Sequence, residues 1–214
     1  MKDETEKPTV PPPSEAFEDP GLRRAALAAE AGDLAQLRVM KDVDLDTIER
    51  SGISLLVYEI TAGNELAVRT LLAAGANPNV LAPSGTSAMF AAGVTPDSKF
   101  LRLLLDNGGD PNLEDQRKEP LLTRLVYFDQ WDNLLLLLDR GAQIDAVGPS
   151  GQTAALMFGS LHQFDHVYAL LERGADPTIQ DVNGLQLSNF VNQRVAPDSP
   201  QASWQKKVAE RIGL

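Results

Sequence analysis

Short apolar sets with mixed spacings of three and four residues recur along the chain. Residues 51–85 hold two of them, the first at Leu55, Leu56, Glu59 and Ile60, the second at Leu66, Val68, Leu71 and Leu72. Such spacings predict amphipathic helices, and Gly63 with Asn64 between the sets predicts a break. Because isolated helices of this length are marginal in water, we expect helix pairs that are stabilised by packing on their neighbours.

A glycine follows each apolar pair at a constant interval. These glycines are Gly75, Gly108, Gly141 and Gly174, each 33 residues after the one before. A second set keeps the same step: Gly52, Gly85, Gly151 and Gly184, with Lys118 at the position where a further glycine is expected. A fixed period of this length is typical of stacked helical repeats. A glycine directly after a helix commonly adopts the left-handed conformation, so each repeat is expected to turn there.

The turn that ends each repeat has its own signature. It reads "GANPN" at 75–79, "GGDPN" at 108–112, "GAQID" at 141–145 and "GADPT" at 174–178. On these residues the chain resembles the ankyrin-repeat family. The resemblance implies an all-α fold, an ankyrin-repeat solenoid of about five to six helix-turn-helix units with short loop or hairpin fingers.

The helix-opening motif of the family is degraded in this chain. In place of Thr-Pro-Leu-His stand "SLLV" at 54, "SAMF" at 87, "PLLT" at 120 and "TAAL" at 153, and the histidine is never present. The resemblance assigns that histidine to a hydrogen-bond network between repeats. We therefore expect apolar packing by Val57, Phe90 and Leu156 to replace it.

Three segments are expected. Residues 1–19, acidic and proline-rich, predict a disordered tether, either a free terminus or a linker left by a removed signal. Residues 20–193 form the repeat array. Residues 194–214 predict a helix that caps the last repeat, since Ser199 and Pro200 suit a helix start and Trp204, Val208 and Ile212 form one stripe. The alternative for this helix is contact with a partner.

Charge and composition narrow the function classes. The formal net charge is −11, from 19 basic and 30 acidic side chains, which disfavours a nucleic acid as partner. The absence of cysteine excludes disulfides and thiolate chemistry but suits the cytoplasm and the periplasm equally. No signal peptide is visible, so a trimmed lipid anchor is the one route to a membrane that the sequence leaves open.

The sequence offers little chemistry. His162 and His166 are four residues apart, a spacing that could place both on one helical face for a metal. In the repeat register, however, His162 replaces a helix-breaking glycine and His166 lies inside a helix, which favours structural roles. We predict no catalytic residue, no metal, no cofactor and no enzymatic activity.

Surface positions are therefore the candidate functional residues. By resemblance, ankyrin proteins bind other proteins through the loop tips and the exposed end of each first helix. On this register the partner-binding candidates are Leu81, Pro83, Ser84, Val94, Thr95, Glu114, Gln116, Arg117, Tyr127, Phe128, Trp131, Val147, Pro149, Ser150, Ser160, Leu161, Gln180 and Asn183. Tyr127 and Phe128 are favoured as binding hot spots. The alternative is that these aromatics and Trp131 fill gaps left by the missing histidines.

The resemblance implies a protein-protein interaction module. Its narrower version is a bacterial immunity protein that binds and neutralises a secreted effector toxin, such as a phospholipase of a type VI secretion system, in the periplasm. An acidic inhibitor would be steered onto a basic toxin or lipase surface. The alternative is a general adaptor or scaffold whose bound partner stays active.

Overall fold

The structure is a computed structural model that describes residues 10–193 and 195–214. It consists of two compact units, residues 1–110 and 111–214, which we describe separately as unit 1 and unit 2. The described residues form thirteen α-helices and no strand, as the helical pattern predicted. Within them, no helix has both the length and the apolar composition that crossing a bilayer requires.

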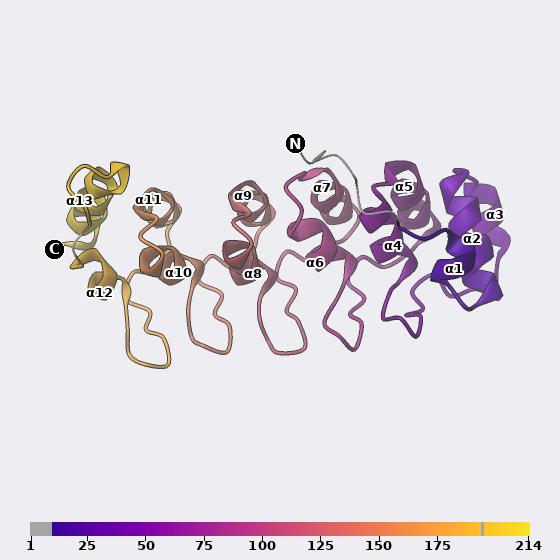
Figure 1. Cartoon of the computed structure of the whole chain (residues 1–214), viewed down its shortest axis with the longest axis horizontal. Helices are drawn as coiled ribbons and strands as arrows, with labels where there is room; N and C mark the ends of the chain where they lie inside the picture. The colour runs from indigo at the N-terminus through magenta and orange to yellow at the C-terminus, as the bar shows by residue number, and fades with distance from the viewer. Residues whose placement is uncertain (1–9, 194) are drawn as a thin grey trace, which may run out of the picture. The chain divides into compact units, whose positions relative to one another are not determined.

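Unit 1 contains three helix pairs after a short first helix, α1 (Pro13–Ala16). The pairs are α2 (Pro20–Glu30) with α3 (Leu34–Val39), α4 (Leu55–Ala62) with α5 (Glu65–Ala74), and α6 (Ala88–Gly93) with α7 (Lys99–Asp106). Helix α4 packs on α6, and α5 packs on α2, α3 and α7. Within this unit, α4 and α6 lie toward the long loops and α5 and α7 lie farther from them (Figure 1).

Unit 2 repeats the arrangement. Its pairs are α8 (Leu121–Tyr127) with α9 (Trp131–Asp139), α10 (Ala154–Ser160) with α11 (Phe164–Glu172), and α12 (Leu187–Val191) with α13 (Pro200–Ile212). Helix α10 packs between α8 and α12, and α13 packs on α11. The loop that precedes each first helix forms a finger that extends away from the pair (Figure 1).

Capping Ser and Thr side chains start the first helices, and glycines in the left-handed conformation end both helices of the second pair. Ser54, Ser87 and Thr153 each accept the backbone N–H three residues further on, which caps the first helix of their repeats. At the other ends, Gly63 has φ 75° and Gly75 has φ 103°, so glycine terminates both helices of the second pair in the left-handed conformation. The predicted helix boundaries of residues 51–75 are thus observed.

In three repeats an apolar side chain occupies the last position of the degraded motif, where the family has histidine. Val57, Phe90 and Leu156 are 7%, 6% and 2% exposed, and Thr123 at the equivalent position is fully buried. The stacking of these repeats therefore uses dispersion and apolar burial where the resemblance implies a histidine network.

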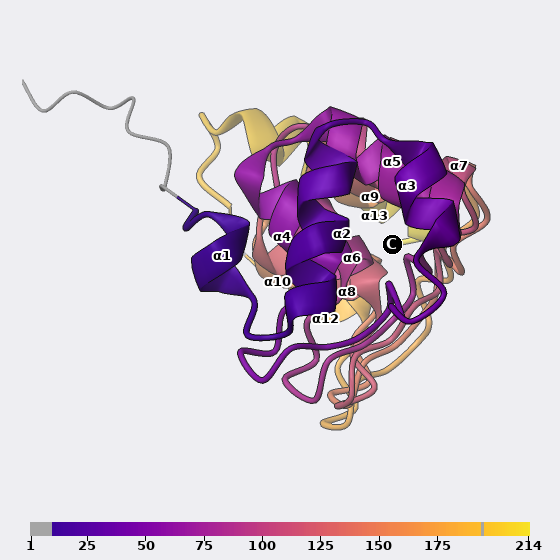
Figure 2. The same cartoon turned by 90° about the vertical axis from the view of Figure 1, so that its right-hand side faces the viewer.

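The N-terminal segment differs from the expected disordered tether over residues 10–19. Helix α1 lies beside α2 in unit 1 (Figure 2). The ring of Phe17 is 1% exposed and meets the Tyr58 ring edge-on at 5.1 Å. The Tyr58 hydroxyl donates to the Pro11 carbonyl at 2.7 Å. Residues 1–9 of the predicted tether lie outside the described residues.

At the other end, α13 covers α11 and α12. The Ser199 side chain accepts the Gln201 N–H at 3.2 Å, which caps the helix start. Of the predicted stripe, Val208 is fully buried while Trp204 and Ile212 are half-buried. Arg194, where the predicted segment begins, lies outside the described residues.

Candidate functional site

The predicted contact residues fall into both units, and none of them is fully buried. In unit 1, Pro83 and Ser84 are exposed while Leu81, Val94 and Thr95 are half-buried. In unit 2, Trp131 and Ser150 are half-buried. The exposed members in unit 2 are Glu114, Gln116, Arg117, Tyr127, Phe128, Val147, Pro149, Ser160, Leu161, Gln180 and Asn183.

Two aromatic rings stand exposed at the end of helix α8. Tyr127 is 62% exposed and Phe128 is 47% exposed. The Arg124 guanidinium, one turn earlier on α8, lies over the Phe128 ring at 5.6 Å from its centroid. Leu161, at the equivalent position of the next repeat, is 56% exposed. The interpretation of Tyr127 and Phe128 as gap fillers in the core does not fit their exposure.

Trp131 has a different environment. Its ring stacks on His166 with centroids 4.1 Å apart and meets Phe158 edge-on at 5.5 Å. Phe158 is 1% exposed and His166 is half-buried, so Trp131 joins α9 to α10 and α11. Trp131 therefore belongs to the packing of unit 2, with one part of the ring left at the surface.

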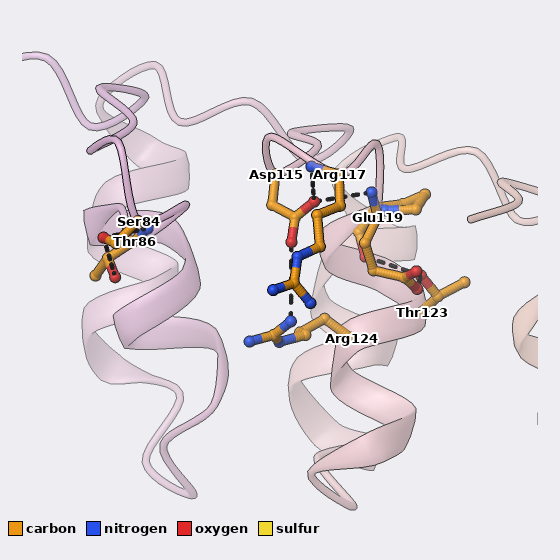
Figure 3. Close-up of polar contacts among 8 residues, drawn as sticks. Ser84, Thr86, Asp115, Arg117, Glu119, Thr123 and Arg124 are labelled. Carbon is orange, nitrogen blue, oxygen red and sulfur yellow. Dashed lines mark hydrogen bonds and ion pairs between the residues drawn. The ribbon is translucent and has the colours of Figure 1, made fainter. Parts of the chain in front are cut away.

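In the finger before α8, residues 114–120, the Asp115 carboxylate accepts two backbone hydrogen bonds. Asp115 Oδ1 accepts the backbone N–H of Arg117 at 2.7 Å and that of Glu119 at 3.0 Å (Figure 3). The Asp115 side chain is 9% exposed, and its Oδ2 lies 3.8 Å from Arg124 Nη1. A β-bridge between Glu114 and Pro120 closes the base of the finger. The tip residues 116–118 are thus carried on a hydrogen-bonded base.

Lys118 occupies a backbone conformation that suits glycine. Its φ is 64°, close to the values of 84° at Gly85, 74° at Gly151 and 77° at Gly184 in the other fingers. A side chain in the left-handed region costs about 1–2 kcal/mol. The Lys118 side chain is 82% exposed, with Nζ 3.5 Å from Glu114 Oε2. The sequence pattern showed the substitution but not that the backbone keeps the glycine geometry.

The fingers at residues 82–86 and 181–185 carry no such cation at the tip. In unit 1, Ser84 Oγ donates to Thr86 Oγ1 at 3.1 Å (Figure 3). In unit 2, Asp181 accepts the N–H groups of Asn183 and Leu185, at 2.8 and 2.9 Å. These bonds, that from Leu185 first, lower the pKa of Asp181. Asp181 thus supports its finger as Asp115 does, but the tip it supports is neutral.

A ladder of side-chain hydrogen bonds joins consecutive turns and was missed from the sequence. In each step an Asp or Asn oxygen accepts a backbone N–H of the following turn signature at 2.7–3.0 Å. The pairs are Asp46 with Asn77 and Asn79 with Asp110 in unit 1, and Asn112 with Gln143 and Asp145 with Asp176 in unit 2. Asn79 and Asn112 also donate to Gly108 and Gly141 carbonyls. The acceptors recur every 33 residues, so the period could have found them.

One buried carboxyl group stands out in unit 1. Glu59 of α4 is fully buried, and neither of its carboxyl oxygens has a hydrogen-bond partner among the described residues. Desolvation, with a second contribution from the Glu30 charge, raises its pKa to about 8, against the opposing effect of the Asn64 side chain. Burial likewise raises the pKa of the adjacent Tyr58 to about 12. Glu59 is therefore neutral in the folded unit at pH 7.

The two histidines do not come together as a metal site. His162 has φ 58° in its glycine slot and its Nε2 lies 3.1 Å from Gln193 Oε1, whereas His166 stacks on Trp131. Over residues 10–193 and 195–214, no three His, Asp or Glu side chains are placed to hold a metal ion. Unit 2 presents an exposed aromatic pair at the end of α8 and, before the start of that helix, a finger with two exposed cations, Arg117 and Lys118.

Comparisons with known proteins agree with this architecture. No protein-family model matches the chain. An ankyrin repeat-containing protein of Treponema pallidum (strain Nichols) is 41% identical over 63 residues, which cover 29% of this chain and 21% of that protein. The crystal structure of EF0377, described as an ankyrin repeat protein, matches with a TM-score of 0.70 and 21% identity, covering 90% of this chain and 97% of that one.

Proposed function

Because this chain is an ankyrin-repeat protein, we propose that it works without catalysis, as a module that binds another protein through unit 2. The exposed pair Tyr127 and Phe128 supports this function. Aromatic side chains are enriched among the residues that dominate binding energy. Removing two adjacent rings from water when a partner covers them is favourable and stabilises the complex.

The proposed surface combines three features of α8 and of the finger that precedes it. The aromatic pair supplies apolar area, Arg124 joins it to the finger, and Arg117 lies at the finger tip. We define the α8 face as Arg117, Lys118, Arg124, Tyr127 and Phe128. An apolar centre with a polar rim is the usual composition of a protein interface.

The test is the double substitution Tyr127→Ala with Phe128→Ala. We expect partner binding to weaken by more than about 2 kcal/mol, roughly thirtyfold in Kd, with little change in the midpoint of thermal unfolding. The matched control is Leu27→Ala with Val39→Ala in unit 1, where the side chains are 57% and 72% exposed. Equal weakening by both pairs, or a collapse of stability in the first, contradicts the proposal.

Within this class, we propose that the partner is a secreted effector toxin, with a phospholipase as the candidate enzyme and this protein as its immunity protein. The net charge of −11 supports the idea because it would speed encounter with a basic enzyme surface. An equimolar mixture with such an effector should form a stable complex and lose the effector's activity. The other candidate is an adaptor or scaffold, in which case the captured partner remains fully active.

A further inference from the structure

We propose that the finger tip of unit 2, through Arg117 and Lys118, binds a carboxylate-bearing segment of the partner protein. The inference rests on the proposed protein-binding function and adds the chemistry of the partner segment: an acidic side chain a few residues from an apolar one. The sign is opposite to that of the chain as a whole, which carries −11.

Two of the three carboxylates of the finger are turned inward, while its cations face water. Asp115 is committed to two backbone N–H groups and is 9% exposed. Glu119 accepts the Thr123 hydroxyl, and its carboxylate packs where a Cβ on Gly148 would lie. Glu114 is the acid that remains at the surface, 44% exposed and 3.5 Å from Lys118. At the tip itself, the exposed charges are therefore those of Arg117 and Lys118, with Glu114 beside Lys118.

Arg117 supplies the group that recognises the carboxylate. Its side chain is exposed and forms no ion pair in the part of the chain that the structure describes. Figure 3 shows it extending toward Arg124, whose guanidinium is 3.8 Å from Asp115 and lies over the Phe128 ring. Guanidinium groups bind carboxylates with paired, directed hydrogen bonds.

Lys118 adds a second cation to the tip in a backbone conformation that favours glycine. Glycine would occupy φ 64° without strain, and it does so in the fingers at Gly85, Gly151 and Gly184. A lysine here lowers stability while placing a second cation beside Arg117 on a preorganised turn.

The partner segment must reach from the finger to the aromatic pair. Helix α8 between them has seven residues, which corresponds to about 10 Å at 1.5 Å per residue. An extended chain spans this distance in about three residues. The matching segment therefore carries an acidic residue at least three positions from an apolar one.

The test uses the full chain and a blocked peptide, Asp-Asp-Gly-Gly-Leu-Leu, followed by NMR of backbone amides at 0.15 M salt. Under this condition charges beyond about 8 Å are screened, so the net charge of the protein contributes little. We expect the amide chemical shifts of residues 117–119 and 127–128 to change and to saturate as this peptide is added. The Asn-Asn-Gly-Gly-Leu-Leu peptide should leave the chemical shifts of residues 117–119 unchanged. Arg117→Gln with Lys118→Gln should weaken binding of the acidic peptide roughly fivefold.

The control removes the same charge elsewhere on unit 2, by Arg173→Gln with Lys206→Gln, and should leave peptide binding unchanged. Lys118→Gly should raise the midpoint of thermal unfolding by about 4 °C and should weaken binding of the acidic peptide. Equal loss in the control, unchanged binding by Lys118→Gly, or tighter binding of single-stranded DNA than of the peptide overturns the proposal. Suppose that the finger variants do not change peptide binding, but Tyr127→Ala with Phe128→Ala still weakens partner binding. The proposed function then stands and this inference alone fails.

Discussion

The buried carboxyl group of Glu59 predicts that the stability of unit 1 falls as pH rises. The ordinary pKa of a glutamate is 4.5, and that of Glu59 is raised to about 8. Between these two values the unfolded chain releases a proton that the folded unit keeps. The contribution of Glu59 to stability is therefore complete below the unfolded pKa and is lost as pH rises through the folded pKa.

The magnitude follows from about 1.4 kcal/mol per pH unit in this window. The loss relative to a neutral side chain is about 1 kcal/mol at pH 5, about 3 kcal/mol at pH 7 and close to 5 kcal/mol well above pH 8. Glu59→Gln keeps the shape of the side chain and removes its titration. We expect this variant to match the parent near pH 4 and to exceed it by about 3 kcal/mol at pH 7.

The assay is urea unfolding from pH 4 to 9, followed by circular dichroism for the whole chain. Trp131 and Trp204 both belong to unit 2, so their fluorescence follows that unit separately. Glu15→Gln, which removes an exposed carboxylate from the same unit, is the control. Glu30→Gln should lower the pKa of Glu59 by removing the neighbouring charge. A stability difference between Glu59→Gln and the parent that is constant with pH refutes the reasoning.

Three further substitutions test other elements of the fold. Asn79→Ala removes the two hydrogen bonds of its amide to the next turn and should cost about 1–3 kcal/mol in denaturant unfolding, with faster amide exchange in that turn as the local readout. Tyr58→Phe removes the bond to a carbonyl of the N-terminal segment and should cost about 1 kcal/mol, and protease cleavage before residue 20 should accelerate. Gly151→Ala, at φ 74° with backbone atoms of Asp181 3.1 Å from the added Cβ, should lower the unfolding midpoint more than Gly184→Ala, which has φ 77° and open space.

Local residue types determined most of the finger and turn geometry. Gly63 and Gly75 end their helices because glycine alone enters the left-handed region without strain, and Ser54 begins α4 because its hydroxyl can cap it. The candidate site was predicted in part. Tyr127 and Phe128 were placed on the surface by register alone, whereas Trp131 turned out to pack on His166. The repeat register predicts on which side of its helix a residue lies, but not which side chain of a neighbouring helix packs against that residue.

The sequence by itself determined the helix pairs and their step, because periodic apolar positions and glycine turns act within one repeat. Its turn signatures carried the resemblance to the ankyrin-repeat fold. The tertiary structure decided what depends on neighbours. It showed that the backbone keeps Lys118 in the glycine conformation, that Asp115 supports the cationic tip, and that α1 docks on unit 1. It also placed Glu59, which the sequence pattern counts with the apolar positions, fully away from water. The physical reason is that desolvation and packing are properties of the stacked repeats, which no single repeat contains.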